Sequence, residues 1–247
     1  LLGDDVALVS LMVGNNESGA IQPIEEVCKL THEAGAYFHT DATQAIGKIP
    51  VDVVAIGADY LSLSGHKFYG PKGIGVLYAK HGVPLTPFVH GGHQEKGYRA
   101  GTYNNQAIIG IGMAAKLAYE NLEEEHDKLW ALREELRKGI EASIPNVTVN
   151  GPKDGAKVLP GTLNVSFASA EGESILLYLD MEGIEVSTGS ACNSTSTELS
   201  HVITAIDLPS EYAFGTIRIS LGYENTREEV EMIANALQII LGSQSKQ

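Results

Sequence analysis

Lys67 follows a predicted strand at residues 59–63 and stands in the run Ser64-Gly65-His66-Lys67. Ligands of open α/β sheets gather at the carboxyl ends of strands. An amine at such a position can form an imine with an aldehyde, and Ser64 and His66 can donate hydrogen bonds to a phosphate. The alternative is a solvated surface lysine, which is the commoner outcome for a lysine at a strand end.

A second polar pair, Asp41 and Gln44, follows the strand predicted at 36–39. Pyridoxal 5'-phosphate (PLP) is an electron sink only while its pyridine nitrogen is protonated, and a neighbouring carboxylate keeps it so. Asp41 can be that carboxylate, and Gln44 can donate to the phenolic oxygen of the ring. The alternative for Asp41 is a cap on the following turn. Two polar strand ends in adjacent units of one sheet favour the cofactor.

Cys192 lies in the segment 187–200, whose Ser and Thr content predicts a loop. The thiolate is the reactive form of cysteine, and exposure favours it whereas burial opposes it. A loop thiol can carry a transferred atom to an external acceptor, although a lone loop cysteine is often incidental. The other cysteine, Cys28, shares an apolar helix face with Ile24 and Val27, which predicts a place in the core.

Strands and helices alternate along the chain, which predicts an α/β layer architecture. Residues 104–141 predict one long helix or two, and they lead into a second, smaller α/β unit. We therefore expect domains at residues 1–118 and 119–247. The remaining predicted elements are a buried parallel strand at 6–13, a helix from Pro23 that Gly35 ends, strands at 74–79, 163–168, 184–187 and 216–221, a helix at 173–181, and a last helix opened by a Thr226/Glu229 capping box.

Composition narrows the classes of function. A net charge of −14 argues against non-specific binding to nucleic acid, which needs Lys and Arg at the phosphates. No apolar run reaches the roughly 18 residues of a membrane span. Two cysteines suit a reducing compartment, so we expect a cytoplasmic protein. His90 and His93 lie in a glycine-rich run without a tetrahedral ligand set, so no metal site is expected.

Five motifs in a fixed order carry a specific resemblance that runs along the whole chain. They are residues 15–19 (NNESG), 39–44 (HTDATQ), 64–73 (SGHKFYGPKG), 99–102 (RAGT) and 189–194 (GSACNS). Together they resemble the cysteine desulfurases of the NifS/IscS type, in the class V aminotransferase family. About the first third of a family member has no counterpart in this sequence.

The resemblance implies a PLP-dependent transferase type I (aspartate-aminotransferase-like) fold, with a partial large-domain sheet and a smaller C-terminal α/β domain. It implies a homodimer as well. Lys67 would bind the cofactor, with His66 close by as a second catalytic group. The other roles that it implies are Asp41 at the pyridine nitrogen, Gln44 and Asn16 at the ring oxygen, Ser64 and His66 at the phosphate, Thr102 at the phosphate of the neighbouring subunit, and Arg218 with Asn16 at the substrate carboxylate.

The reaction that the resemblance implies converts L-cysteine to L-alanine and leaves the sulfur as a persulfide on Cys192. Lys67 would act as a base at the α-carbon. The sulfur would pass to an iron–sulfur scaffold or another acceptor protein. Three alternatives stay open: an inactive fragment that docks a partner, one half of an enzyme completed by a separate N-terminal polypeptide, and an activity of the selenocysteine lyase kind.

Overall fold

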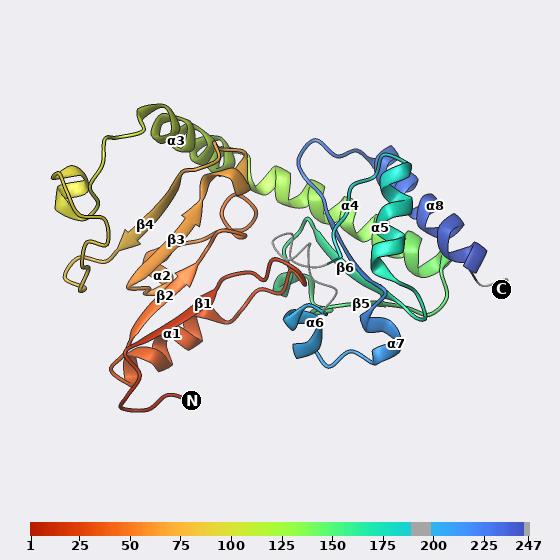
Figure 1. The fold of residues 1–247 in the computed structure, drawn as a ribbon, viewed down its shortest axis with the longest axis horizontal. Coiled ribbons are helices and arrows are strands. Elements are labelled where there is room, and N and C mark those ends of the chain that lie inside the picture. The colour runs from red at the N-terminus through yellow and green to blue at the C-terminus, as the bar shows by residue number, and fades with distance from the viewer. Residues whose placement is uncertain (189–198, 245–247) are drawn as a thin grey trace. The chain divides into compact units, whose positions relative to one another are not determined.

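The computed structural model describes residues 1–188 and 199–244 of the chain. It confirms the α/β fold (Figure 1). The described chain forms two compact units. Unit 1 comprises Leu1–Gly14 and Gln22–Leu122, and unit 2 comprises Asn15–Ile21 and Glu123–Gln247. The division expected at 118/119 stays a prediction about where independently folding domains meet.

Unit 1 is built on a four-stranded sheet with the order β1-β2-β3-β4. The first three strands are parallel, and β4 runs antiparallel to β3. Figure 1 shows α1 beside β1 and β2. The strands are β1 (Leu8–Met12), β2 (Tyr37–Asp41), β3 (Tyr60–Ser64) and β4 (Gly75–Ala79), and the helices are α1 (Ile24–Glu33), α2 (Val53–Ile56), α3 (Asn105–Glu120) and the 3-10 turns η1 (Gly65–Phe68) and η2 (Gln94–Gly97).

Helix α1 forms where the amphipathic pattern placed it. Ile24 and Cys28 are buried on its inner face, which confirms the core position predicted for Cys28. Gly35 follows the helix with a φ of 78°, a conformation that costs glycine little. Pro23 is the N-cap rather than the first helical residue, a correction of one position.

The β1 strand corrects the prediction of a buried strand at 6–13. It is parallel to β2, as expected, but it lies at the edge of the described sheet. Val9 and Leu11 point to one face and pack against the core, whereas Leu8 points to the opposite face and is 51% exposed. A continuous apolar run indicates burial on both faces, and within the described residues only one face of β1 is covered.

Unit 2 is built on a three-stranded antiparallel sheet with the order β5-β6-β7. One face of this sheet supplies Leu163, Val165 and Ile217 to a core that also contains Leu136 and Leu237. The strands are β5 (Val147–Val149), β6 (Thr162–Phe167) and β7 (Thr216–Ser220), and the helices are α4 (Leu122–Ser143), α5 (Gly172–Met181), α6 (His201–Ala205), α7 (Ser210–Ala213), α8 (Arg227–Gln244) and the 3-10 turn η3 (Gly155–Lys157).

Several predicted elements of unit 2 are confirmed and one is wrong. The Thr226/Glu229 capping box forms, since the Glu229 amide donates to Thr226 Oγ1 (3.3 Å) and the Thr226 amide donates to Glu229 Oε2 (3.0 Å). The strand expected at 184–187 is absent, because only Ser187 makes a single β-bridge there, with Arg218. No helix within the described residues is long and apolar enough to cross a membrane.

Candidate active site

Asp41 and Ser64 are the last residues of β2 and β3, which are neighbouring parallel strands. Asp41 lies opposite Ser62 in the register, so the carboxyl ends of the two strands lie side by side at the same end of the sheet. Asp41 Oδ1 accepts from the Thr43 amide at 2.8 Å. The turn-capping alternative and the strand-end position therefore both hold for Asp41, and its second carboxylate oxygen accepts no bond from any described residue.

Lys67 lies on η1, immediately after the end of β3. The turn is closed by backbone bonds from Gly70 N to Gly65 O (2.9 Å) and from Gly65 N to Ile74 O (3.0 Å). It packs against α3, since a methyl group added at Gly65 would lie 3.1 Å from Ile111 Cδ1. The backbone of η1 is thus fixed, whereas the Lys67 side chain is exposed and binds no described residue.

The face of the sheet that carries Asp41 is lined by polar side chains. Residues at i and i+2 of a strand share a face, so His39 lies on the same side as Asp41. His39 Nδ1 lies 2.7 Å from Ser10 Oγ, and His39 Nε2 lies 3.1 Å from Ser62 Oγ. The imidazole thereby links β1, β2 and β3 beside the Asp41 carboxylate.

Gln44, His66 and Thr102 complete the predicted residues of unit 1. Gln44 Oε1 accepts from Lys48 Nζ at 3.2 Å, which leaves the amide nitrogen of Gln44 available as a donor. His66 is exposed next to Lys67, whereas Thr102 is exposed in the segment before α3. The structure brings Asp41, Ser64, His66 and Lys67 together at the carboxyl ends of β2 and β3. It does not place Thr102 in this group.

This donor set fits PLP. A primary amine, an uncommitted carboxylate oxygen, a serine hydroxyl and an imidazole come together at the carboxyl ends of parallel strands, where ligands of open sheets bind. PLP needs an amine for its aldehyde, an anion for its pyridinium and donors for its phosphate. Among the described residues, no group of His, Cys, Asp and Glu could hold a metal ion.

Arg218 and Asn16 belong to unit 2 and are in contact there. Arg218 Nη1 donates to the backbone oxygen of Asn16 at 3.0 Å. Burial lowers the pKa of the Arg218 guanidinium, and the negative charge of Glu17 opposes that shift. Arg218 Nε is buried and has no partner among the described residues. A buried donor without a partner indicates a missing acceptor, and a carboxylate suits a guanidinium.

The loop that presents Asn16 is a tight turn. Asn15 Oδ1 accepts from the amides of Glu17 and Ser18, both at 2.9 Å. Gly19 has a φ of 74° and lies close to Thr162 on β6. The turn also buries Glu17, which the sequence analysis missed. An acid inside an Asn-initiated turn that ends in Gly is the only local signal that pointed to it.

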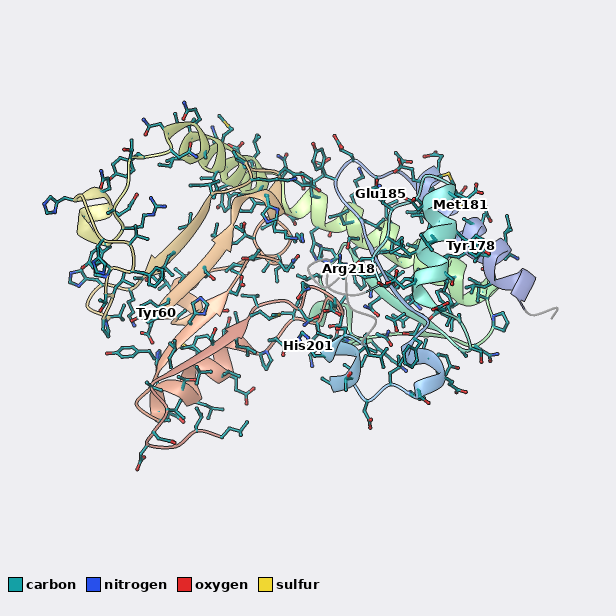
Figure 2. All side chains as sticks on the ribbon, in the orientation of Figure 1. Tyr60, Tyr178, Met181, Glu185, His201 and Arg218 are labelled. Carbon is teal, nitrogen blue, oxygen red and sulfur yellow. The ribbon has the colours of Figure 1, made fainter. Side chains whose placement is uncertain are left out.

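Cys192 lies outside the described residues. The residues on either side of that gap are described, and both belong to unit 2. Ser187 exchanges two backbone bonds with Arg218, with N···O distances of 2.6 and 3.1 Å. Ser200 caps α6 by accepting from the Val202 amide at 3.1 Å. Figure 2 shows Arg218 on β7 and His201 at the start of α6.

The sequence matches the family Aminotransferase class-V over residues 1–233. The chain belongs to this family. It is 52% identical over 238 residues to the cysteine desulfurase IscS of Clostridium botulinum strain Hall, with 96% of this chain and 60% of that protein covered. It is 49% identical over 233 residues to the cysteine desulfurase NifS of Azotobacter vinelandii, with 94% and 58% covered.

Solved structures agree with this assignment. A NifS-like protein superimposes with a TM-score of 0.89 at 38% identity, over 98% of this chain and 63% of that one. A structure of SspA in complex with cysteine gives a TM-score of 0.71 at 37% identity, over 89% and 60%. The fold and the family of PLP-dependent enzymes predicted from the motifs are thus confirmed, and the chain spans about 60% of the length of the curated relatives.

Proposed function

We propose that this protein is a PLP-dependent cysteine desulfurase that converts L-cysteine to L-alanine and retains the sulfur on Cys192. The observation that carries the proposal is the meeting of Lys67 and Asp41 at the ends of neighbouring parallel strands. About half of the residues of this chain are identical to those of proteins named cysteine desulfurase, which supports the same proposal. Arg218, with its buried donor, supports an amino-acid substrate.

The proposal gives each candidate site residue a role. When bound, PLP supplies an electron sink for the carbon skeleton of the substrate. Lys67 Nζ would hold the cofactor, and the same amine would take the α-proton of the substrate. The Asp41 carboxylate keeps the pyridine nitrogen protonated. The supporting contacts are Gln44 and Asn16 at the ring oxygen, Ser64 and His66 at the phosphate, and Arg218 with Asn16 at the substrate carboxylate.

Cys192 performs the sulfur transfer. Its thiolate forms a bond to the substrate sulfur while the carbon–sulfur bond breaks. The electron pair of that bond goes to the β-carbon, which takes up a proton. One L-cysteine and one thiol thus become one L-alanine and one persulfide, without an external oxidant or reductant.

Two substitutions test the proposal in the intact protein. Cys192→Ser should abolish the formation of L-alanine from L-cysteine, because no thiol remains to accept the sulfur; alanine formed at the parental rate would refute the proposed role. Lys67→Ala should remove the visible absorbance of lysine-bound PLP. Lys72→Ala is the matched control, since this lysine is exposed in the same segment and should leave the absorbance unchanged.

The partners follow from the same proposal. We propose a homodimer in the cytoplasm, with Thr102 reaching the cofactor phosphate of the neighbouring subunit, and an iron–sulfur scaffold or another protein as the sulfur acceptor. The mass of the native assembly tests the homodimer, because two copies of the chain have twice the mass of one.

A further inference from the structure

Glu17 is the most buried acidic side chain of the described residues, with 1% of its surface exposed. Burying a carboxylate is costly unless it is hydrogen-bonded. Its Oε2 accepts from Ser200 Oγ at 2.6 Å, across 183 positions of sequence and within unit 2. The reaction proposed above gives this carboxylate no role.

The backbone around Glu17 is fixed from two sides. Asn164 Nδ2 on β6 donates to the Glu17 carbonyl at 3.2 Å. Arg218 on the neighbouring strand β7 donates to the carbonyl of Asn16, one residue earlier. Asn164 is itself buried and accepts from Asn150 Nδ2 at 2.7 Å. The Glu17 turn is thus attached to the polar face of the small sheet rather than to a mobile surface.

Both described flanks of the Cys192 segment are attached to this same cluster. The N-terminal flank, Ser187, pairs with the backbone of Arg218. The C-terminal flank, Ser200, donates its hydroxyl to Glu17. Ser200 therefore contacts the Asn16–Glu17 turn directly, and Ser187 is connected to it through Arg218.

We propose that Glu17 is a positioning residue, which holds the C-terminal flank of the Cys192 segment through Ser200 to the turn that also holds Arg218. The inference rests on the proposed function, since Cys192 is taken as the sulfur acceptor and Arg218 as the carboxylate ligand. A hydrogen bond from a hydroxyl to a carboxylate is short and strong compared with a neutral one. Loss of this bond releases Ser200 from Glu17, and we expect sulfur transfer to Cys192 to become slower, because the rate depends on how the reacting groups are positioned.

The test measures the single-turnover rate of persulfide formation on Cys192 by mass spectrometry, in the intact PLP-bound protein. Glu17→Ala should lower this rate about 10-fold, the effect expected when one hydrogen bond to a charged group is lost. Glu17→Gln keeps an acceptor for Ser200 and should stay within about threefold of the parent. Equal losses in both variants would overturn the proposal, because the charge rather than the hydrogen bond would then matter.

Ser200 variants keep the proposal testable if Glu17→Ala does not fold. Ser200→Gly removes the hydroxyl that donates to Glu17, and glycine is tolerated at the N-cap of α6. It should lose about 10-fold in rate, with the affinity for L-alanine changed less than about twofold. The double variant Glu17→Ala/Ser200→Gly should be no slower than the slower of the two single variants, since both single variants remove the same Glu17–Ser200 bond. Additive losses would contradict a direct Glu17–Ser200 contact.

Hydrogen exchange supplies a readout that does not need turnover. The Thr204 amide donates to the Ser200 carbonyl at 3.0 Å, and its exchange should accelerate about 10-fold in Glu17→Ala. Ser174→Ala is the matched control, because it removes another Ser–Glu bond of unit 2, to Glu171 at 2.8 Å; it should leave both readouts at parental values. A parent that forms no persulfide would refute the proposed function, whereas a parental rate in folded Glu17→Ala would refute only the positioning role.

Discussion

At the scale of single residues, the two cysteines have opposite expected chemistry. Cys28 is 1% exposed, and its Sγ lies 3.9 Å from His32 Nδ1. His32 Nε2 in turn lies 2.7 Å from Asp59 Oδ2. Burial raises the pKa of the Cys28 thiol, and the negative charge of Asp59 raises it further, against a smaller opposing effect of Lys80. The arrangement resembles a nucleophile with its base, yet both leading influences disfavour the thiolate.

Thiol labelling tests this distinction. In Cys192→Ser protein, Cys28 is the only cysteine, and iodoacetamide should modify it at least about 100-fold more slowly in the native state than in urea, because burial and a raised pKa both suppress the thiolate. Mass spectrometry of quenched samples gives both rates. Similar rates in the two states would show that the native protein exposes a reactive Cys28.

Residue types alone led to the core position of Cys28 but not to the burial of Glu17. Cys28 recurs with Ile24 on a helical period, which is local information. The partners of Glu17 are 147 positions away at Asn164 and 183 positions away at Ser200. No local pattern encodes contacts at that separation, so a charged residue in a turn is expected to be solvated.

At the scale of elements, α4 carries a charge network against β6. Arg133, 3% exposed, donates Nε to the Thr162 carbonyl at 2.8 Å and Nη1 to Glu134 Oε1 at 2.6 Å. Arg137 donates Nη2 to Glu134 Oε2 at 2.7 Å. The hydrogen bond from Arg137 is the main reason that the pKa of Glu134 lies below its ordinary value, and the charges of both arginines act in the same direction.

The sign of this shift predicts a pH dependence. Because the folded-state pKa of Glu134 is lowered, its contribution is complete above the unfolded pKa and is lost as the pH falls through the folded pKa. Glu134→Gln should lower the free energy of unfolding by about 1–2 kcal/mol at pH 7, and the difference should shrink below about pH 4. Urea unfolding at several pH values measures it. Glu185→Gln, at an exposed position labelled in Figure 2, is the control, and a pH-independent difference would contradict the ion-pair explanation.

The Thr226/Glu229 capping box, whose code is local, was predicted, and the two errors in unit 2 are short segments whose strand character depends on a partner strand. The Thr226/Glu229 box carries its own hydrogen bonds, and α8 begins after it. Apolar and polar residues alternate at 184–187, which resembles a strand, yet only Ser187 forms a β-bridge there. The short β5 strand was missed because its three residues gain their conformation from pairing with β6.

At the scale of the whole molecule, the described residues form two separate hydrophobic cores. Phe38 belongs to the core of unit 1, and Leu136 belongs to the core of unit 2. The segment Asn15–Ile21 belongs to unit 2, although the sequence on both sides of it belongs to unit 1. When two segments of one chain belong to different cooperative units, their amide hydrogens exchange with solvent through separate unfolding events.

Two consecutive amides allow the boundary between unit 2 and unit 1 to be measured. The Ile21 amide donates to the Lys157 carbonyl in unit 2 at 2.8 Å, whereas the Gln22 amide donates to the Val13 carbonyl in unit 1 at 2.8 Å. Leu136→Ala should destabilise unit 2 by about 2–5 kcal/mol, and hydrogen exchange resolved to single residues should then accelerate at Ile21 and not at Gln22. Phe38→Ala, costing about 3–5 kcal/mol, should do the reverse. If both amides respond alike to both variants, the two cores open together and the chain is a single cooperative unit; opposite responses place the boundary between these neighbouring residues, where no feature of composition marks it.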